Sequence, residues 1–345
     1  MRIVPRPTRW LPPEWAAQQC VLLTWPHDGG DWGTRLADAE TTFTAMARAI
    51  ASRQALVVSC NDQRLQEQVT ALLGDLAAVS IITAPSNDIW VRDHGPVTVI
   101  SDGTAELLDF RFNGWGGRYP AALDDRIPAT LVSAGLFPDA RYTPINTVFE
   151  GGSIDTDGEG TLLVTSSCLL NPNRNGNVDR AWFETRAQQW FGCDRVLWLD
   201  HGALEGDDTD GHVDMLARFA PGDRILYTAC DDPADSHATE LAAMAGELRA
   251  FRTRSGRPYD LLPLPWPPET RDENGNRLPL SYANFLVING AVLVPVYGVA
   301  TDDAALAVIA DAFPGRDIEP IPARPLIRQH GSVHCASMQV PFAAT

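Results

Sequence analysis

A histidine and an aspartate two residues apart stand out in the acidic segment 206–214, where His212 is followed by Asp214. Residues two apart in a strand point to the same face. The two side chains are therefore expected to lie together at the start of a strand over 215–219, where a purely structural strand would be apolar. The pair favours a site in which the imidazole carries protons.

Metal binding is the first alternative for this segment. If Gly211 were the sixth position of a calcium loop, Gly206 and Ala217 would be its first and twelfth, and neither has a carboxylate. Zinc needs three or four ligands, which His201, His212 and an aspartate could supply, but no His-x-x-x-His spacing is present. The segment therefore predicts no metal site.

A second polar group lies in residues 87–96, where Trp90, Arg92 and Asp93 crowd together before a strand-like run. Recognition of a guanidinium requires a carboxylate that accepts two parallel N–H bonds and an aromatic wall for the flat cation. Asp93 and Trp90 supply both parts. A structural arginine–aspartate network is the alternative.

Two further residues complete the set of candidates. Glu150 stands before Gly151 and Gly152, and paired glycines let the backbone approach a site closely. Cys335 is one of six cysteines, without any C-x-x-C pair, so the pattern indicates free thiols. A cysteine nucleophile needs a base from elsewhere in the chain, and His212 is the best candidate.

The overall charge limits the classes of partner. The chain of 345 residues carries a net charge of −17, which disfavours nucleic acid and anionic membrane surfaces and favours a small cationic molecule. No apolar run is long enough to span a membrane, and the N-terminus lacks the apolar core of a signal peptide. A cytoplasmic location is expected, and the oligomeric state, including a homo-oligomer, stays open.

Strand-like and helix-like segments alternate, which predicts an α/β fold. One domain over residues 1–345 is expected. The predicted strands cover 20–25, 55–60, 97–100, 161–165, 196–199, 225–229, 285–288 and 291–296. The predicted helices cover 38–52, 64–73, 179–191, 238–250 and 302–313. Much of residues 255–281 is rich in proline, which indicates a long loop, either on the surface or packed over a site.

The polar candidates recur at an irregular interval along the chain. Positions 93, 150, 212, 284 and 335 each adjoin glycine and a strand-like run, with separations of 57, 62, 72 and 51 residues. The spacing is too irregular for a sequence repeat. It suits about five supersecondary units that place their polar ends around one centre.

With these segments identified, the chain resembles the agmatine deiminases, within the bacterial-type peptidyl-arginine deiminase grouping of the guanidino-group-modifying superfamily. The resemblance runs in order over most of the chain. It rests on Trp25-Pro26, Asp31-Trp32, residues 87–96, residues 112–117, Glu150-Gly151-Gly152, residues 210–214, residues 281–285 and His334-Cys335.

The resemblance implies a fivefold pseudo-symmetric α/β propeller of ββαβ units. It implies that Asp93 and Asp214 hold the two sides of a guanidinium, that Glu150 orients His212, and that Cys335 attacks the central carbon. No metal or organic cofactor is implied. The expected reaction is hydrolysis of agmatine to N-carbamoylputrescine and ammonia through a covalent amidino-cysteine intermediate.

The remaining implied substrate contacts are Trp90, Asp208 and Asn284. The far end of agmatine is an ammonium, which suits Asp207, Asp208 or the face of Trp90. Two departures from the family pattern affect this end of the pocket. Asp208 stands where a glutamate is usual, and residues 329–332 replace a glycine-rich run.

Three alternatives stay open at this point. A deiminase acting on arginine or on C-terminal peptidyl-arginine would use the same chemistry. An amidinotransferase would resolve the intermediate with an amine. A non-catalytic propeller would have lost the catalytic set, whereas all five positions here hold the expected residues.

Overall fold

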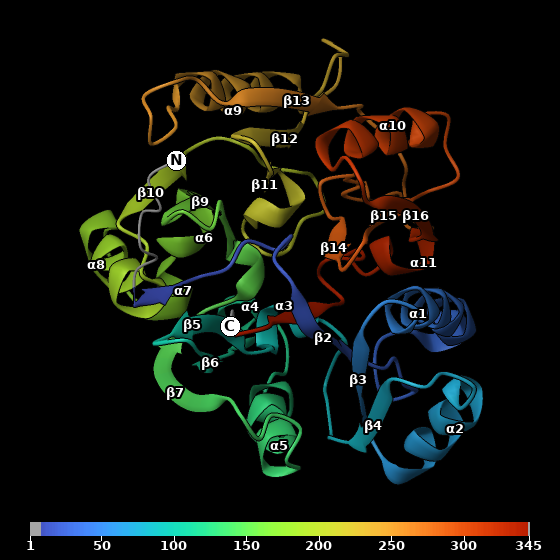
Figure 1. The fold of residues 1–345 in the computed structure, drawn as a ribbon. Coiled ribbons are helices and arrows are strands. Elements are labelled where there is room, and N and C mark those ends of the chain that lie inside the picture. Colours follow the sequence, from blue (N-terminus) through green and yellow to red (C-terminus); the bar gives the residue numbers. More distant parts are fainter. Residues whose placement is uncertain (1–7, 344–345) are drawn as a thin grey trace.

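Five small β-sheets surround a common centre in the computed structural model, which describes residues 8–343 (Figure 1). In four of these sheets the chain forms an antiparallel pair of strands, passes through a helix and returns as a parallel third strand. The described chain is therefore an α/β propeller of ββαβ units, which confirms the expected fold class. One domain over residues 1–345 stays a prediction.

The bounds of the four units follow in chain order. The first has β5 (Val97–Ser101), β6 (Thr104–Arg111), α5 (Ile127–Ser133) and β7 (Arg141–Val148). The second has β8 (Ile154–Thr156), β9 (Thr161–Thr165), α8 (Arg180–Phe191) and β10 (Arg195–Leu199). The third has β11 (Ala217–Ala220), β12 (Arg224–Thr228), α9 (Ala238–Ala250) and β13 (Asp260–Leu264). The fourth has β14 (Leu286–Ile288), β15 (Ala291–Val296), α10 (Asp302–Ala312) and β16 (Asp317–Pro322).

The fifth unit is assembled from both ends of the chain. The C-terminal strand β17 (Met338–Pro341) pairs antiparallel with β2 (Gln18–Thr24). Strand β2 continues through α1 (Leu36–Ala51) to the parallel strand β3 (Ala55–Cys60), and α2 (Gln63–Leu73) leads on to β4 (Val79–Thr83). This pairing closes the ring beside α1 and α2 in Figure 1.

The irregular spacing noted in the sequence has a structural basis. The five polar anchors, at positions 93, 150, 212, 284 and 335, each lie shortly before the first strand of a unit. Those strands begin at residues 97, 154, 217, 286 and 338. The anchors therefore occupy equivalent places in the five units, and their intervals differ because the loops and helices of each unit differ in length.

The predicted helices and strands are confirmed to within a few residues, including the edge strands β10, β11 and β14. The inner strand β6 was missed, as were the edge strands β4, β7, β8, β13, β16 and β17. Strands β7, β13 and β16 each lie at the edge of a sheet and contain Pro144, Pro263 and Pro320. An edge strand tolerates proline because one row of its N–H groups has no strand partner. The expected loop over 255–281 is accordingly interrupted by β13. None of the helices within residues 8–343 is long and apolar enough to cross a membrane.

A buried ion-pair network joins the N-terminal segment to this ring. Arg218 of β11 donates to Glu14 Oε2 at 2.8 Å and to Asp155 Oδ1 at 3.2 Å, and its guanidinium lies over the Phe285 ring. The Arg218 side chain is only 1% exposed. Removal of one member of such a network leaves buried charges without a partner, which costs more than the loss of the bonds alone.

We therefore expect Arg218→Met to destabilise the protein by about 3–5 kcal/mol, since Glu14 and Asp155 would stay buried without their cation. Urea unfolding followed by circular dichroism measures the change. The matched control is Arg254→Met, at an ion pair with Asp194 that is largely solvent-exposed. Equal urea midpoints for the two variants would show that the Arg218 network contributes no more to stability than an exposed ion pair.

Candidate active site

A cavity with about 810 Å³ of empty space, including its open mouth, lies among the polar anchors. Its inner wall includes Asp93, Trp90 and Cys335, and its outer part includes Asp88 and Asp208. His212, Glu150, Asp214 and Asn284 lie directly behind this wall and are buried. The structure thus brings seven of the eight predicted site residues to one centre, and Asp208 to its entrance.

His212 and Asp214 meet at this centre, but not for the reason expected. Residues Val213–Met215 form a 3-10 turn, and strand β11 begins only at Ala217. The prediction that strand alternation places the two side chains together is therefore wrong. The tight turn does so instead, and Gly211, with φ of +88°, allows the chain to enter it.

Asn284 fixes the segment that carries Cys335. Its Oδ1 accepts bonds from the backbone N–H groups of His334 and Cys335 at 3.0 and 3.2 Å, and its Nδ2 donates to Cys335 Sγ at 3.1 Å. Cys335 Sγ lies 3.7 Å from Asp214 Oδ2. The neighbouring His334 contacts the same Asp214 oxygen, with its Nδ1 2.8 Å from Asp214 Oδ2. Its Nε2 lies 2.7 Å from Glu14 Oε2.

Asp93 is positioned by neutral donors. The backbone N–H of Gly152 bonds to its Oδ1 and the indole N–H of Trp115 bonds to its Oδ2, both at 3.0 Å. The neighbouring Arg92 points away from the cavity and donates to Gln339 Oε1 at 2.7 Å. Trp115 belongs to the family pattern over residues 112–117, and no local pattern predicts its bond to Asp93.

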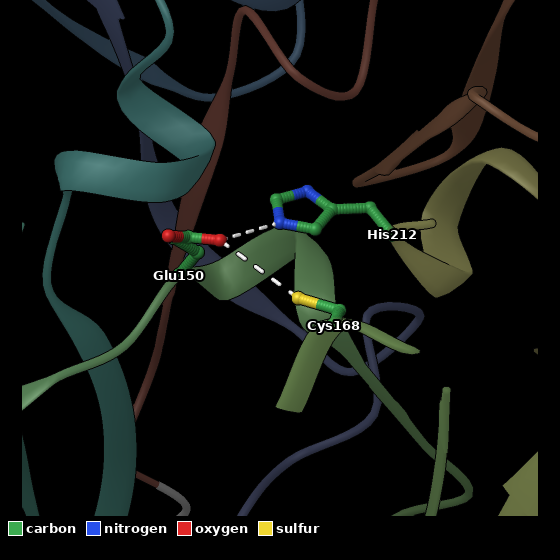
Figure 2. Close-up of side chains that lie close together, drawn as sticks. All are labelled: Glu150, Cys168 and His212. Carbon is green, nitrogen blue, oxygen red and sulfur yellow. Dashed lines mark hydrogen bonds and ion pairs between the residues drawn. The ribbon is translucent and has the colours of Figure 1, made fainter. Parts of the chain in front are cut away.

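Glu150 is shared between His212 and an arginine that the sequence analysis missed. Its Oε2 lies 2.8 Å from His212 Nε2, and Arg174 donates to both of its carboxylate oxygens at 2.8–3.0 Å. Figure 2 shows the carboxylate turned toward both the imidazole and the thiol of Cys168, whose Sγ lies 3.9 Å away. Arg174 lies in the turn-rich segment 171–176, which has no periodic pattern that could have marked it.

The cluster of Glu150, Cys168 and His212 has the ligand types of a metal site, with ligand atoms within 4.8 Å of one another. However, both Glu150 oxygens already accept bonds from the Arg174 cation. A metal ion would have to displace this guanidinium and the proton between Glu150 and His212. The cluster is better suited to holding a proton on the imidazole.

Two buried polar atoms at the centre have no hydrogen-bond partner among the described residues, although His212 Nδ1 lies 3.6 Å from Asp93 Oδ1. They are Asp214 Oδ1 and His212 Nδ1. A Cβ atom built on Gly152 would lie 2.6 Å from His212 Nδ1, 2.9 Å from Asp93 Oδ1 and 3.1 Å from Asp214 Oδ2. Three acceptor or donor groups therefore converge on one point, and glycine is required at position 152 to leave that point free.

The electrostatics of this centre favour a bound cation. Burial, together with Asp214 and Glu150, raises the pKa of Asp93 to about 6. Burial alone would lower the pKa of His212, but Asp93, Cys168 and Glu150 raise it well above its usual value. Burial and the charges of Asp214 and Asp93 raise the pKa of Cys335 well above that of a free thiol. A cation between the two aspartates would oppose the shifts of both Asp93 and Cys335.

The entrance of the cavity is also acidic. Burial and the nearby charges of Asp31 and Asp208 raise the pKa of Asp88 to about 7. Tyr119 donates to Asp208 Oδ2 at 2.9 Å, and burial is the main cause that raises the pKa of Asp208. Three carboxylates around the entrance form a second place for positive charge.

These features, five ββαβ units around an enclosed thiol, imidazole and carboxylate set, define the class of α/β-propeller enzymes known as penteins. A model of the Porphyromonas-type peptidyl-arginine deiminase family matches residues 10–341, and the chain belongs to that family. It is an enzyme, a hydrolase acting on C–N bonds. The suspected family is thus confirmed.

Individual relatives are similar to this chain over almost their whole length. The agmatine deiminase of Stutzerimonas stutzeri is 32% identical, with 96% of this chain and 95% of the relative covered. The structure of C. jejuni agmatine deiminase with substrate bound is 32% identical, with a TM-score of 0.90 and coverage of 97% and 96%. A Porphyromonas gingivalis structure, described provisionally as an arginine deiminase, is 44% identical, with a TM-score of 0.91 and coverage of 97% and 99%.

The convergence on Gly152 leads to a first prediction for this site. Gly152→Ala should lower turnover at least about 100-fold, because its Cβ would occupy the point shared by His212, Asp93 and Asp214. The control is Gly246→Ala in helix α9, where the added Cβ meets no atom closer than 4.0 Å. This control should keep its activity and gain up to about 1 kcal/mol of stability. Full activity of Gly152→Ala would contradict the geometry.

The charge on Asp214 leads to a second prediction. Asp214 raises the pKa of Cys335, so Asp214→Asn should increase the thiolate fraction at neutral pH. Alkylation of Cys335 by iodoacetamide, followed by peptide mass spectrometry, should then be faster in the variant, although turnover is lost. In the unsubstituted protein, alkylation should rise with pH through the alkaline range without a plateau near pH 7. Cys230 serves as the internal control, and a slower reaction of Cys335 in the variant would refute the assignment.

Proposed function

We propose that this enzyme hydrolyses a guanidino group and that agmatine is its substrate. The observation that carries the proposal is the pair Asp93 and Asp214, two buried carboxylates on either side of the point beside Gly152 and next to Cys335. A planar cation with several N–H donors fits between two such carboxylates through charge-assisted bonds. These bonds also localise the charge of the guanidinium and make its carbon a better electrophile.

The first half-reaction forms a bond between Cys335 Sγ and the guanidinium carbon. Asp93 and Asp214 hold the cation, and the thiol proton leaves to solvent as the substrate binds. The resulting tetrahedral adduct loses one nitrogen, which takes a proton from His212 and departs as ammonia. The product of this step is a covalent amidino-cysteine, a thiouronium.

The charge of the substrate is large enough to activate the thiol. Two opposite unit charges about 4 Å apart attract each other by about 4 kcal/mol at an effective dielectric constant of about 20. This energy corresponds to a fall of about 3 units in the pKa of the thiol. Since the pKa of Cys335 is raised in the free protein, the substrate itself supplies the counter-charge that stabilises the thiolate.

The second half-reaction consumes water. His212, now neutral, removes a proton from a water molecule, and the hydroxide attacks the thiouronium carbon. The carbon–sulfur bond then breaks, Cys335 leaves as the thiolate, and the proton of the added hydroxyl group passes to solvent, which leaves a neutral ureido group. Agmatine and water thus yield N-carbamoylputrescine and ammonia. Glu150, held by Arg174, keeps the imidazole in place and stabilises its charged form through both steps.

The acidic entrance supports agmatine as the substrate. The carboxylates of Asp31, Asp88 and Asp208 surround the outer part of the cavity, where the ammonium of agmatine would lie. Trp90 contributes an apolar wall for the methylene chain. The relatives named agmatine deiminases add support, because they match over almost the whole chain.

A deiminase acting on arginine or on C-terminal peptidyl-arginine is the second candidate, favoured by two arginines at the same entrance. Arg35 and Arg328 line the cavity, and each donates to Glu273 at 2.7 Å. A substrate carboxylate could replace Glu273 between them. The provisional description of the Porphyromonas gingivalis structure agrees with this alternative. We favour agmatine because Glu273 already pairs with both arginines.

The location and assembly of the protein stay predictions. They include the cytoplasmic location, a homo-oligomer, and the exclusion of nucleic acid and membrane as partners. The absence of a cofactor is part of the proposed mechanism, since every step uses side chains, substrate and water.

Ammonia release from agmatine, arginine and a peptide ending in arginine tests the substrate. Agmatine should have the highest kcat/KM, by at least about tenfold, because its ammonium can form charge-assisted bonds with the three carboxylates at the cavity entrance. Glu273→Gln, which leaves Arg35 and Arg328 without their anionic partner, should raise the relative rate on arginine. Activity on the peptide but not on agmatine would reject our choice of substrate.

Mass spectrometry of the enzyme quenched during turnover tests the intermediate. We expect the amidino adduct on Cys335 and on no other cysteine, and we expect Cys335→Ala to lower turnover by about 10⁴-fold or more. Cys230→Ala is the control, because this thiol lies outside the cavity lining. Ammonia release by Cys335→Ala at the normal rate would refute the mechanism. Product analysis with an added amine distinguishes hydrolysis from amidino transfer.

A further inference from the structure

Arg174 contacts two parts of the site that are otherwise separate. Its Nε and Nη2 bond to Glu150, and its Nη1 lies 2.7 Å from Asp210 Oδ2. Its Nη2 also donates to the backbone carbonyl of Thr209 at 2.9 Å. The Arg174 side chain is only 3% exposed, so these charge-assisted bonds are formed away from water.

The loop over residues 206–211 links the cavity entrance directly to His212. Asp208 lines the outer cavity, and Thr209 Oγ1 accepts a bond from the backbone N–H of His212 at 3.0 Å. Within the loop, Asp210 has a φ of +66°, a conformation that has to be held by its surroundings. A displacement of this loop would therefore move Asp208, whereas His212 is held independently by Glu150.

Two arginines hold this loop, and they contribute unequally to its stability. Arg118 contacts Asp210 and the carbonyl of Asp208 from the surface, with 39% of its side chain exposed. Exposed ion pairs contribute little to stability because water screens them, whereas buried hydrogen bonds to charged groups contribute considerably more. Arg174 is thus the principal anchor of the loop.

We propose that Arg174 is a positioning residue that fixes Asp208 for the distal cation of the substrate and Glu150 for His212 through one guanidinium. This inference rests on the proposed function, because it assigns the 206–211 loop to the distal end of agmatine. Arg174 touches neither the substrate nor the reacting atoms. It acts on selectivity through Asp210 and on turnover through Glu150.

A lysine cannot replace this residue. An ammonium is a single point of charge and cannot present the planar fork that bonds Glu150 on one side and Asp210 on the other. The contacts of Arg174 with Glu150 and with Asp210 can also be disrupted separately. Asp210→Asn weakens the contact with the loop and leaves the bonds between Arg174 and Glu150 in place.

The experiment compares agmatine with pentylguanidine, which has a methyl group in place of the ammonium. In Asp210→Asn we expect KM for agmatine to rise about tenfold, with kcat and the constants for pentylguanidine changed less than about threefold. In Arg174→Lys we expect the same loss of selectivity and, in addition, a fall in kcat of at least about tenfold on both substrates. Arg254→Lys, at the exposed pair with Asp194, is the matched control and should change neither.

The double variant Arg174→Lys/Asp210→Asn completes the cycle. If Arg174 acts through Asp210, the second substitution should not reduce selectivity further. Additive losses, or an equal effect of Asp210→Asn on both substrates, would overturn the inference. Failure of the proposed function is distinguishable, because the unsubstituted enzyme would then release no ammonia from agmatine or would not prefer it to pentylguanidine.

Discussion

The site depends on which groups offset the negative charge of three buried carboxylates at its centre. Glu150 has Arg174 and His212 as partners, and Asp214 has His334. Asp93 accepts hydrogen bonds from the neutral donors Gly152 and Trp115, and His212 Nδ1 lies 3.6 Å from its Oδ1. Burial and neighbouring negative charge nevertheless raise its pKa to about 6. Burial of an anion without a cation is costly. The raised pKa of Asp93 indicates that its neighbours offset its burial only in part, and the guanidinium of the proposed substrate has the charge and the shape to stabilise the anion further.

The propeller explains how side chains so far apart in sequence reach this centre. Each unit contributes at least one polar residue just before its first strand, and closure by β17 and β2 brings Cys335 beside segments from the start of the chain. No single unit contains a nucleophile, a proton carrier and a cation site together. Chemistry and ring closure are thus linked, because loss of the β17–β2 pairing would remove the thiol from the carboxylates.

Residue types and spacing predicted much of this arrangement, and the misses have physical reasons. Helix α9 and strands β3, β9 and β15 were predicted with their observed bounds, because strong periodic or β-branched patterns mark them. The edge strands β7, β13 and β16 were missed because proline and exposure hide their pattern. Arg174 was missed because its importance comes from contacts 24 and 36 residues away in the chain, with Glu150 and Asp210. A turn segment carries no local signal for such contacts.

In the proposed mechanism, activation of the thiol by the substrate also favours release of the product. In the free enzyme the pKa of Cys335 is raised, so the thiol stays protonated until a guanidinium lies between Asp93 and Asp214. The ureido product has no charge at the reacting carbon. It therefore loses the charge-assisted bonds to both carboxylates, and it no longer stabilises the thiolate. The same two aspartates that select the cation weaken their hold on the neutral product, so differential binding favours catalysis over product retention.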